Sequence, residues 1–395
     1  MQQSIKQEIT FILLCSRLEL DSETENQAKI LIDTPSFDWE YFYETSLNFG
    51  VLPLLYGHLK NRFKAVVPVH IYKKIKHFFM MNAAKNMVLT NELLKILDLL
   101  KTRDILAVPF KGPALADMVY GSDVLRIFSD IDIFVQESEA VKARDILQEY
   151  GYQLAHEWDK KYDDFYVRVE HAFNLQSPDG KINIDLQWKL LGIYTPEPIT
   201  LEKFKNRLIT EKFGGRDTLQ LACEDLLFYL CVHGTKDGWR KFEWVCCIAE
   251  ILRNHPDLKW DQMIETAKKE CCLKKFKLGL YLAYSLCKAP LPDFFKTEIK
   301  NDEGLKLISK QFEDHFFSNK TLIPDFTNNP RFSTFHIHIQ DGLKNKFRYI
   351  LRQLFRPTTK EILLWSVPWK LNFLYYIFRP IRLLWRIVSY YFYRY

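Results

Sequence analysis

Three aspartates on two short apolar segments are the residues best suited to chemistry. Asp130 and Asp132 lie two positions apart within residues 127–135, a run of branched and aromatic residues that predicts a strand. Side chains two apart on a strand share one face, so both carboxylates would project toward the same point. Like charges this close are unfavourable unless a cation neutralises them, and hard carboxylate oxygens suit Mg²⁺ or Mn²⁺. The pair therefore predicts a metal site.

Asp185 is the third predicted ligand. It lies in segment 181–188, where alternate residues are apolar and the other face carries Asn183, Asp185 and Gln187. Three carboxylates can hold two metal ions about 3.5–4 Å apart, which bind a triphosphate and activate a hydroxyl for in-line displacement of pyrophosphate. We predict Asp185 to be a metal ligand or the base for that hydroxyl. The predicted catalytic and metal-binding residues are Asp130, Asp132 and Asp185.

A turn suited to phosphate lies upstream, at Lys111-Gly112-Pro113. An apolar run at 105–110 predicts a strand before it, and helix-spaced apolar residues follow it. Glycine permits close backbone approach, and proline suits the first helical position. We expect the free amides of Ala114 and Leu115 to face an anion. The predicted nucleotide- and phosphate-binding residues are Lys111, Gly112, Arg126 and Ser129.

Each of these features also has a structural interpretation without chemistry. An isolated D-x-D is usually a solvated strand end, K-G-P is usually a turn, and Asp185 alone could cap a backbone or pair with a lysine. The occurrence of the turn, the D-x-D pair and Asp185 in this order along one chain favours a catalytic site. His171 and His233 could contact phosphate or base, although histidines on such mixed faces are more often packed and hydrogen-bonded.

The elements that must position these residues predict an α+β fold, with a small mixed β-sheet flanked by N-terminal and C-terminal helical units. The predicted divisions are a helical unit at 1–103, the mixed core at 104–200, a second helical unit at 201–340 and a basic aromatic amphipathic tail at 341–395. The core includes a hairpin at 171–188 that turns at 177–180. No strand is convincing from residue 201 onward, and helices are predicted there at 219–232, 244–252 and 275–286.

Composition and charge narrow the class of protein. With 395 residues and 48% hydrophobic content, the chain is long enough for two or three packed units. Its eight cysteines lack the spacing of a disulfide framework or a zinc site, and the N-terminus lacks the pattern of a signal peptide. We therefore expect a reduced, cytoplasmic protein.

The tail concentrates positive charge. Residues 342–395 hold eleven Lys or Arg against Glu361 alone, whereas the whole chain has a formal net charge of +6. Basic residues and prolines interrupt its apolar stretches, so it is too broken to span a bilayer. It predicts an amphipathic helix that either packs on the body or lies on an anionic membrane surface, which would make the protein peripheral to the inner face of the membrane.

The segment 110–116, Phe-Lys-Gly-Pro-Ala-Leu-Ala, together with Tyr120, Arg126 and the S-D-I-D of 129–132, resembles the nucleotidyltransferase superfamily, which has the DNA polymerase beta-like fold. It is most similar to a bacterial family of uncharacterised nucleotidyltransferases. The likeness continues through 184–188 and 226–252, and so covers most of the chain. It implies a nucleotidyltransferase core with Mg²⁺ or Mn²⁺, in which Gly112, the D-x-D pair and Asp185 take the family's roles.

The resemblance also implies the reaction. A nucleoside triphosphate would donate its nucleoside monophosphate to a hydroxyl on an unidentified small molecule, glycan or protein, with release of pyrophosphate. This chain departs from the family pattern at Gln187, where histidine is frequent, at Cys247, where aspartate is expected, and at Gly112-Pro113, where Gly-Ser or Gly-Gly is usual.

Two other classes of function stay open. A glycosyltransferase also uses a D-x-D motif, although there the motif usually ends a strand in a loop, whereas here residues 133–135 continue the strand. A non-catalytic adaptor could retain the core and dock its basic tail on anionic lipid. Nucleic acid is not an expected partner, because the core shows no stacking platform or groove-reading motif.

Overall fold

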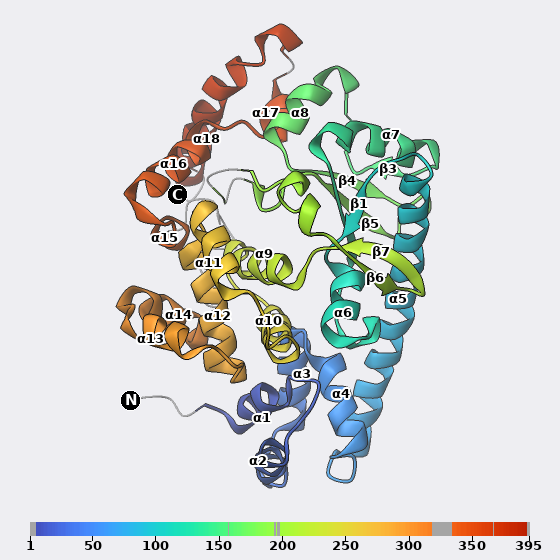
Figure 1. Ribbon diagram of the computed structural model, residues 1–395, viewed down its shortest axis with the longest axis vertical. Coiled ribbons are helices and arrows are strands. Elements are labelled where there is room, and N and C mark those ends of the chain that lie inside the picture. Colours follow the sequence, from blue (N-terminus) through green and yellow to red (C-terminus); the bar gives the residue numbers. More distant parts are fainter. Residues whose placement is uncertain are drawn as a thin grey trace.

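The computed structural model describes residues 5–156, 158–192, 195, 198–317, 334–365 and 367–392. A small sheet lies beside a long helix, and further helices occupy the rest of the molecule (Figure 1). The first part of the chain is helical, as predicted. Its helices are α1 (Gln7–Cys15), α2 (Ser22–Ile32), α3 (Trp39–Phe49), α4 (Leu52–Asn61) and α5 (Val69–Lys101).

The central sheet has five strands in the order β1-β2-β5-β4-β3. They are β1 (Ala107–Pro109), β2 (Asp130–Val135), β3 (Gln153–Leu154), β4 (Ala172–Gln176) and β5 (Asn183–Gln187). Only β2 and β5 pair in parallel, and the other neighbours are antiparallel, so the predicted mixed sheet and the hairpin at 171–188 are confirmed. The parallel register sets Asp132 opposite Asp185, which places both side chains on one face.

The two faces of this sheet differ in chemistry. Ile131, Ile133 and Ile184 are fully buried on one face, where they belong to a hydrophobic cluster with α5 residues such as Leu93. Three further helices, α6 (Gly112–Tyr120), α7 (Ala140–Glu149) and α8 (Asp163–Val169), connect or flank the strands. Because residues alternate along a strand, the aspartates point to the opposite face.

A second set of helices follows the sheet. They are α9 (Cys223–Lys236), α10 (Phe242–Asn254), α11 (Trp260–Lys269), α12 (Leu273–Cys287), α13 (Asp293–Asn301) and α14 (Glu303–Phe317). The predicted helices at 244–252 and 275–286 are confirmed within α10 and α12. Helices α9 and α12 approach closely at Gly279, where an added Cβ would lie 2.6 Å from Cys231 Sγ. One hydrophobic cluster joins these helices to the N-terminal ones.

The prediction that no strand follows residue 201 is wrong. A hairpin of β6 (Ile209–Phe213) and β7 (Arg216–Gln220) forms a separate two-stranded sheet, and residues 219–220 belong to it, so α9 begins only at Cys223. The strands lack apolar alternation because half of their side chains are exposed to solvent. Gly214 and Gly215, with φ of 57° and 78°, form the turn, and this Gly-Gly pair was the available signal.

The C-terminal tail is helical and packs on the body. It contains α15 (Thr334–His338), α16 (Gly342–Phe355), α17 (Thr359–Leu364) and α18 (Leu374–Phe392), and α17 lies beside α8 (Figure 1). Buried Glu361 pairs with Arg379 at 3.1 Å and with Arg382, so part of the tail's charge is neutralised internally. In the described ranges, no helix combines the length and the apolar character that crossing a bilayer requires.

The predicted division at 103, 200 and 340 stays a prediction. Parts of these units lie outside the described residues, namely 1–4, 157, 193–194, 196–197, 318–333, 366 and 393–395.

Candidate functional site

All the predicted site residues line one cavity of about 290 Å³ on the polar face of the sheet. Asp130 and Asp132 come from β2, Asp185 comes from β5, and Lys111 precedes α6. The first half of α10 and the second half of α9 form the opposite wall. The lining residues predicted from the sequence are Asp130, Asp132, Asp185, Lys111, Gly112, Arg126, Ser129, His171 and His233.

Asp132 is the most constrained of the three aspartates, with 3% of its surface exposed. Its Oδ1 accepts a hydrogen bond from Gln187 Nε2 at 2.5 Å and lies 3.3 Å from Lys111 Nζ. Burial raises the pKa of Asp132 to about 6, because the attraction of Lys111 only partly offsets burial and the repulsion of the other two aspartates. Gln187 thus stabilises the central carboxylate.

Asp185 and Asp130 are less buried. Asp185 Oδ1 accepts a hydrogen bond from Asn174 Nδ2 at 2.5 Å, across the β4–β5 register, and burial raises its pKa. Over the ranges that the structure describes, no three His, Cys, Asp or Glu side chains group closely enough to hold a metal ion. The donor chemistry nevertheless fits a hard divalent cation, since three mutually repelling carboxylates face one cavity. Their metal binding stays a prediction.

The Lys111-Gly112-Pro113 segment forms the predicted turn and helix start. Gly112 has φ of 52°, and an added Cβ would lie 2.9 Å from the carbonyl oxygen of Asp130, so only glycine fits between the turn and β2. The prediction of a free amide at Leu115 is wrong, because this amide lies 3.4 Å from the Lys111 carbonyl and donates to it within the first helical turn. The turn therefore offers fewer free amides than expected.

Arg126 is buried and already engaged. Its Nε forms an ion pair with Glu243 of α10, and its Nη1 donates to the Gly112 carbonyl at 3.5 Å. Burial by itself would lower the pKa of Arg126. The attraction of Glu243, together with that of other neighbours, outweighs this effect and raises the pKa of the guanidinium. Arg126 therefore links the turn to α10, and its predicted contact with phosphate stays a prediction.

Cys247, one of the departures from the family pattern, lies close to Glu243. The two residues lie one helical turn apart on α10, and Cys247 Sγ lies 3.6 Å from the Tyr120 hydroxyl. Burial raises the pKa of the Cys247 thiol to about 11, so the thiol is uncharged at neutral pH. The carboxylate that meets Arg126 comes from Glu243, which the sequence analysis did not select.

Several cavity residues on α9 and α10 were missed. Tyr229, His233 and Lys236 recur at helical spacing on α9, and this periodicity was the available signal. His233 lies between Tyr229 and Trp244, with ring centroids 5.4 Å from each, and burial lowers its pKa well below the usual range. His233 is therefore a neutral, packed ring that borders the cavity. The cavity residues on α9, on α10 and between them that were not predicted from the sequence are Tyr229, Lys236, Asp237, Lys241, Glu243 and Trp244.

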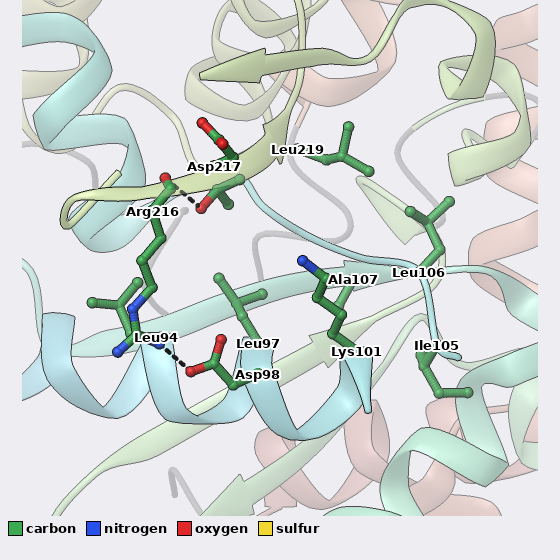
Figure 2. Close-up of a pocket in the computed structure, with 11 residues that line it drawn as sticks. Leu94, Leu97, Asp98, Lys101, Ile105, Leu106, Ala107, Arg216, Asp217 and Leu219 are labelled. Carbon is green, nitrogen blue, oxygen red and sulfur yellow. Dashed lines mark hydrogen bonds and ion pairs between the residues drawn. The ribbon is translucent and has the colours of Figure 1, made fainter. Parts of the chain in front are cut away.

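A larger hollow of about 370 Å³ lies elsewhere, between α5, β1 and the β6–β7 hairpin. Figure 2 shows Arg216 reaching from the hairpin to Asp98 on α5, where the two form an ion pair. None of the predicted site residues lines this hollow. The size of a cavity alone does not identify the site.

A comparison with protein families agrees with the resemblance. The model of a family described as "Uncharacterised nucleotidyltransferase" matches residues 35–288, which include all three aspartates and the turn. The antibiotic-resistance factor ANT(2'')-Ia, studied in solution, is 13% identical over 58% of this chain and 94% of its own, with a TM-score of 0.28. An antigenic nucleotidyltransferase-like protein from Paracoccidioides brasiliensis is 13% identical over 52% and 93%, with a TM-score of 0.29. No curated protein sequence matches significantly.

The buried Arg126–Glu243 pair yields a stability prediction. Glu243→Leu should lower the free energy of unfolding by about 3 kcal/mol, because it leaves a buried guanidinium without its counter-charge. The double variant Arg126→Leu/Glu243→Leu should lose less, since no unpaired charge remains. Urea unfolding of the three proteins measures both changes. Equal losses in the single and double variants would contradict this account of the pair.

Proposed function

Since the chain belongs to the uncharacterised nucleotidyltransferase family, we propose that it moves a nucleoside monophosphate from a nucleoside triphosphate to a hydroxyl-bearing acceptor, with release of pyrophosphate. One observation carries this proposal. The parallel register of β2 and β5 places Asp132 opposite Asp185, and both line the cavity that Lys111 and Gly112 enter from the neighbouring turn. The family match makes the chain an enzyme of the nucleotidyltransferase class, and the donor, the metal and the roles below are our proposals.

Positive charge in the cavity would bind the triphosphate. Three lysines line it: Lys111 before α6, Lys236 at the end of α9 and Lys241 before α10. Fixed cations in a partly closed cavity attract phosphate oxygens strongly. Arg126 and Gly112 would keep the turn in place while phosphate binds. Burial lowers the pKa of Lys236, and a bound phosphate would favour its protonated form.

Asp130, Asp132 and Asp185 would hold Mg²⁺ or Mn²⁺. Such an ion, when bound, neutralises phosphate charge and polarises the phosphorus under attack. The raised pKa of Asp132 reflects a carboxylate that a divalent cation would stabilise in its charged form. Lys111 and Gln187, which both contact Asp132 Oδ1, would orient this carboxylate.

Asp185 is the proposed base for the acceptor. It lies on the side of the site next to β4, and burial raises its pKa, which makes it a better proton acceptor than an exposed aspartate. The acceptor oxygen forms a bond to the α-phosphorus, the bond to pyrophosphate breaks, and the hydroxyl proton passes to the Asp185 carboxylate.

The rival interpretations have less support. The D-x-D motif opens β2, and the strand continues to Val135, whereas the glycosyltransferase motif usually ends a strand in a loop. A non-catalytic core would not need three carboxylates, two of them with raised pKa, on one cavity wall.

We also propose that the tail holds the enzyme on an anionic lipid surface at the inner face of the membrane. Exposed apolar residues recur every fourth position on α16, and a second exposed apolar face lies on α18, which contacts α16. The basic residues around these faces complement anionic headgroups. The exposed apolar residues are Leu343, Phe347, Leu351 and Phe355 on α16, and Tyr376, Ile377, Ile381, Leu384, Trp385 and Val388 on α18.

The catalytic proposal is tested by Asp130→Asn/Asp132→Asn. With Mg²⁺ and each of the four common nucleoside triphosphates, this variant should lose nucleotide turnover by at least about 100-fold, because the fixed charges at the reacting phosphate are gone. Pyrophosphate release measures turnover, and magnesium-dependent nucleotide binding gives a second readout. Asp257→Asn, an exposed aspartate outside the cavity, is the matched control and should behave as wild type. Equal activity of the site variant and wild type would refute the mechanism.

The membrane proposal is tested by Ile381→Ser/Trp385→Ser. Sedimentation with phosphatidylglycerol-containing vesicles should fall about tenfold or more, because two apolar contacts with lipid are lost. Met80→Ser/Met87→Ser removes two equally exposed apolar side chains from α5 and should change nothing. Binding of wild type should also weaken in salt. The membrane role would be refuted if wild type and both variants sedimented equally with the vesicles, or if wild type did not sediment with them at all.

A further inference from the structure

A second pocket adjoins the site and shares two of its residues. It has a volume of about 270 Å³, and both His171 and Asp185 line it as well as the first cavity. Its walls come from β4, from α8, from the segment before α8 and from α17 of the tail. Because Asp185 lies where the two spaces meet, a molecule in this second pocket would face the proposed base.

The pocket has a rigid aromatic wall. The rings of Trp158 and Tyr166 meet edge to face with centroids 4.5 Å apart, and Tyr166 stacks on Phe173 at 4.9 Å with an interplanar angle of 3°. Trp158 Nε1 donates to Asp163 at 2.9 Å, and the Tyr166 hydroxyl donates to the Ala172 carbonyl at 3.1 Å. Their polar atoms are thus satisfied, which leaves ring surface as the chemistry that this wall offers.

The two spaces differ in charge. The described residues that line the second pocket include the carboxylates of Glu170 and Asp185 and the imidazoles of His156 and His171, but no Lys or Arg. His171 Nδ1 lies 3.9 Å from Glu170 Oε2. The first cavity is lined by four cations and five carboxylates, and the cations are Lys111, Arg126, Lys236 and Lys241. These cations, together with the divalent metal that the three aspartates would hold, would suit an anionic triphosphate. A cation suits the second pocket, because both carboxylates and aromatic faces attract positive charge.

Glu170 is fixed in place by the tail. One of its carboxylate oxygens accepts hydrogen bonds from Thr359 N at 2.8 Å and from Thr359 Oγ1 at 3.1 Å, at the start of α17. Thr359 and Leu363 also line the pocket. The tail thereby completes the pocket wall and holds the carboxylate that a cation would meet.

We propose that this pocket binds the acceptor, and that the acceptor is a small hydroxyl-bearing organic cation of the amino alcohol or amino sugar class. Its ammonium group lies against Trp158 and Glu170, and its hydroxyl points to Asp185. The hydroxyl oxygen then attacks the α-phosphorus, pyrophosphate leaves with the bonding electrons, and Asp185 takes the proton. This inference rests on the proposed function, since it assigns the substrate class of that same site.

Binding of matched sugars to the full-length protein, without nucleotide, tests the proposal. Isothermal titration should show that glucosamine binds more tightly than glucose, which lacks the ammonium group. Glu170→Gln should weaken glucosamine binding about tenfold, because it removes the charge while its amide oxygen can still accept from Thr359. Trp158→Leu should weaken binding by a similar factor through loss of the aromatic face. Glu211→Gln, an exposed glutamate on β6, is the charge-matched control.

The outcomes separate this inference from the proposed function. Equal binding of the two sugars, no binding of either, or glucosamine binding unchanged in both Glu170→Gln and Trp158→Leu would overturn the acceptor class. Nucleotide turnover plays no part in this assay. If Asp130→Asn/Asp132→Asn released pyrophosphate as fast as wild type while glucosamine still bound as predicted, the transfer mechanism would be overturned and the acceptor class would stand.

Discussion

The buried Asp132 carboxylate is the constraint on which the site depends. The parallel register of β2 and β5 sets it opposite Asp185, and strand geometry sets it on the same face as Asp130. A carboxylate this deep with two like charges nearby is costly unless positive charge and hydrogen-bond donors compensate. Lys111 and Gln187 provide that compensation in this structure, and both reach the same oxygen of Asp132.

The surrounding fold supports this arrangement from three sides. The apolar face of the sheet packs with α5 and α7, so the strands that carry the aspartates are held firmly. Gly112 lets the turn approach the Asp130 carbonyl closely, and Arg126 ties the same turn to Glu243 on α10. Helices α9 and α10 form the opposite wall of the cavity, where Lys236 ends α9 and Lys241 precedes α10. The lining divides the space into a cavity with both lysines and carboxylates, where we propose that phosphate binds, and an aromatic pocket with two carboxylates next to it.

The sequence predicted the parts of the site that local patterning controls. Alternating apolar residues in 127–135 and 181–188 place the aspartates on polar strand faces, and the Gly-Pro pair predicts the start of α6. The α+β class and the hairpin at 171–188 followed from the same signals. Contacts between residues far apart in the sequence could not be predicted from local patterns. Nothing local shows that Arg126 meets Glu243, 117 positions later, or that Thr359 from the tail meets Glu170.

The missed hairpin has a different cause. Half of the side chains of β6 and β7 are exposed, so apolar alternation is weak, and only the Gly214-Gly215 turn marks the strands. The burial of Arg126 and its acidic partner could not be read from one segment, and its predicted contact with phosphate stays a prediction. Departures from the family pattern, at Gln187 and Cys247, gain physical meaning only from their neighbours Asp132, Tyr120 and Glu243.

The most direct test of the central claim is to locate the metal. Crystals grown with Mn²⁺ and a non-hydrolysable nucleoside triphosphate analogue would give an anomalous signal at the bound ion. Our account predicts that this ion is coordinated by Asp130, Asp132 and Asp185, with the phosphates next to Lys111 and the Gly112 turn. Mn²⁺ bound away from these aspartates, or nucleotide bound in the hollow between α5 and the β6–β7 hairpin, would contradict it.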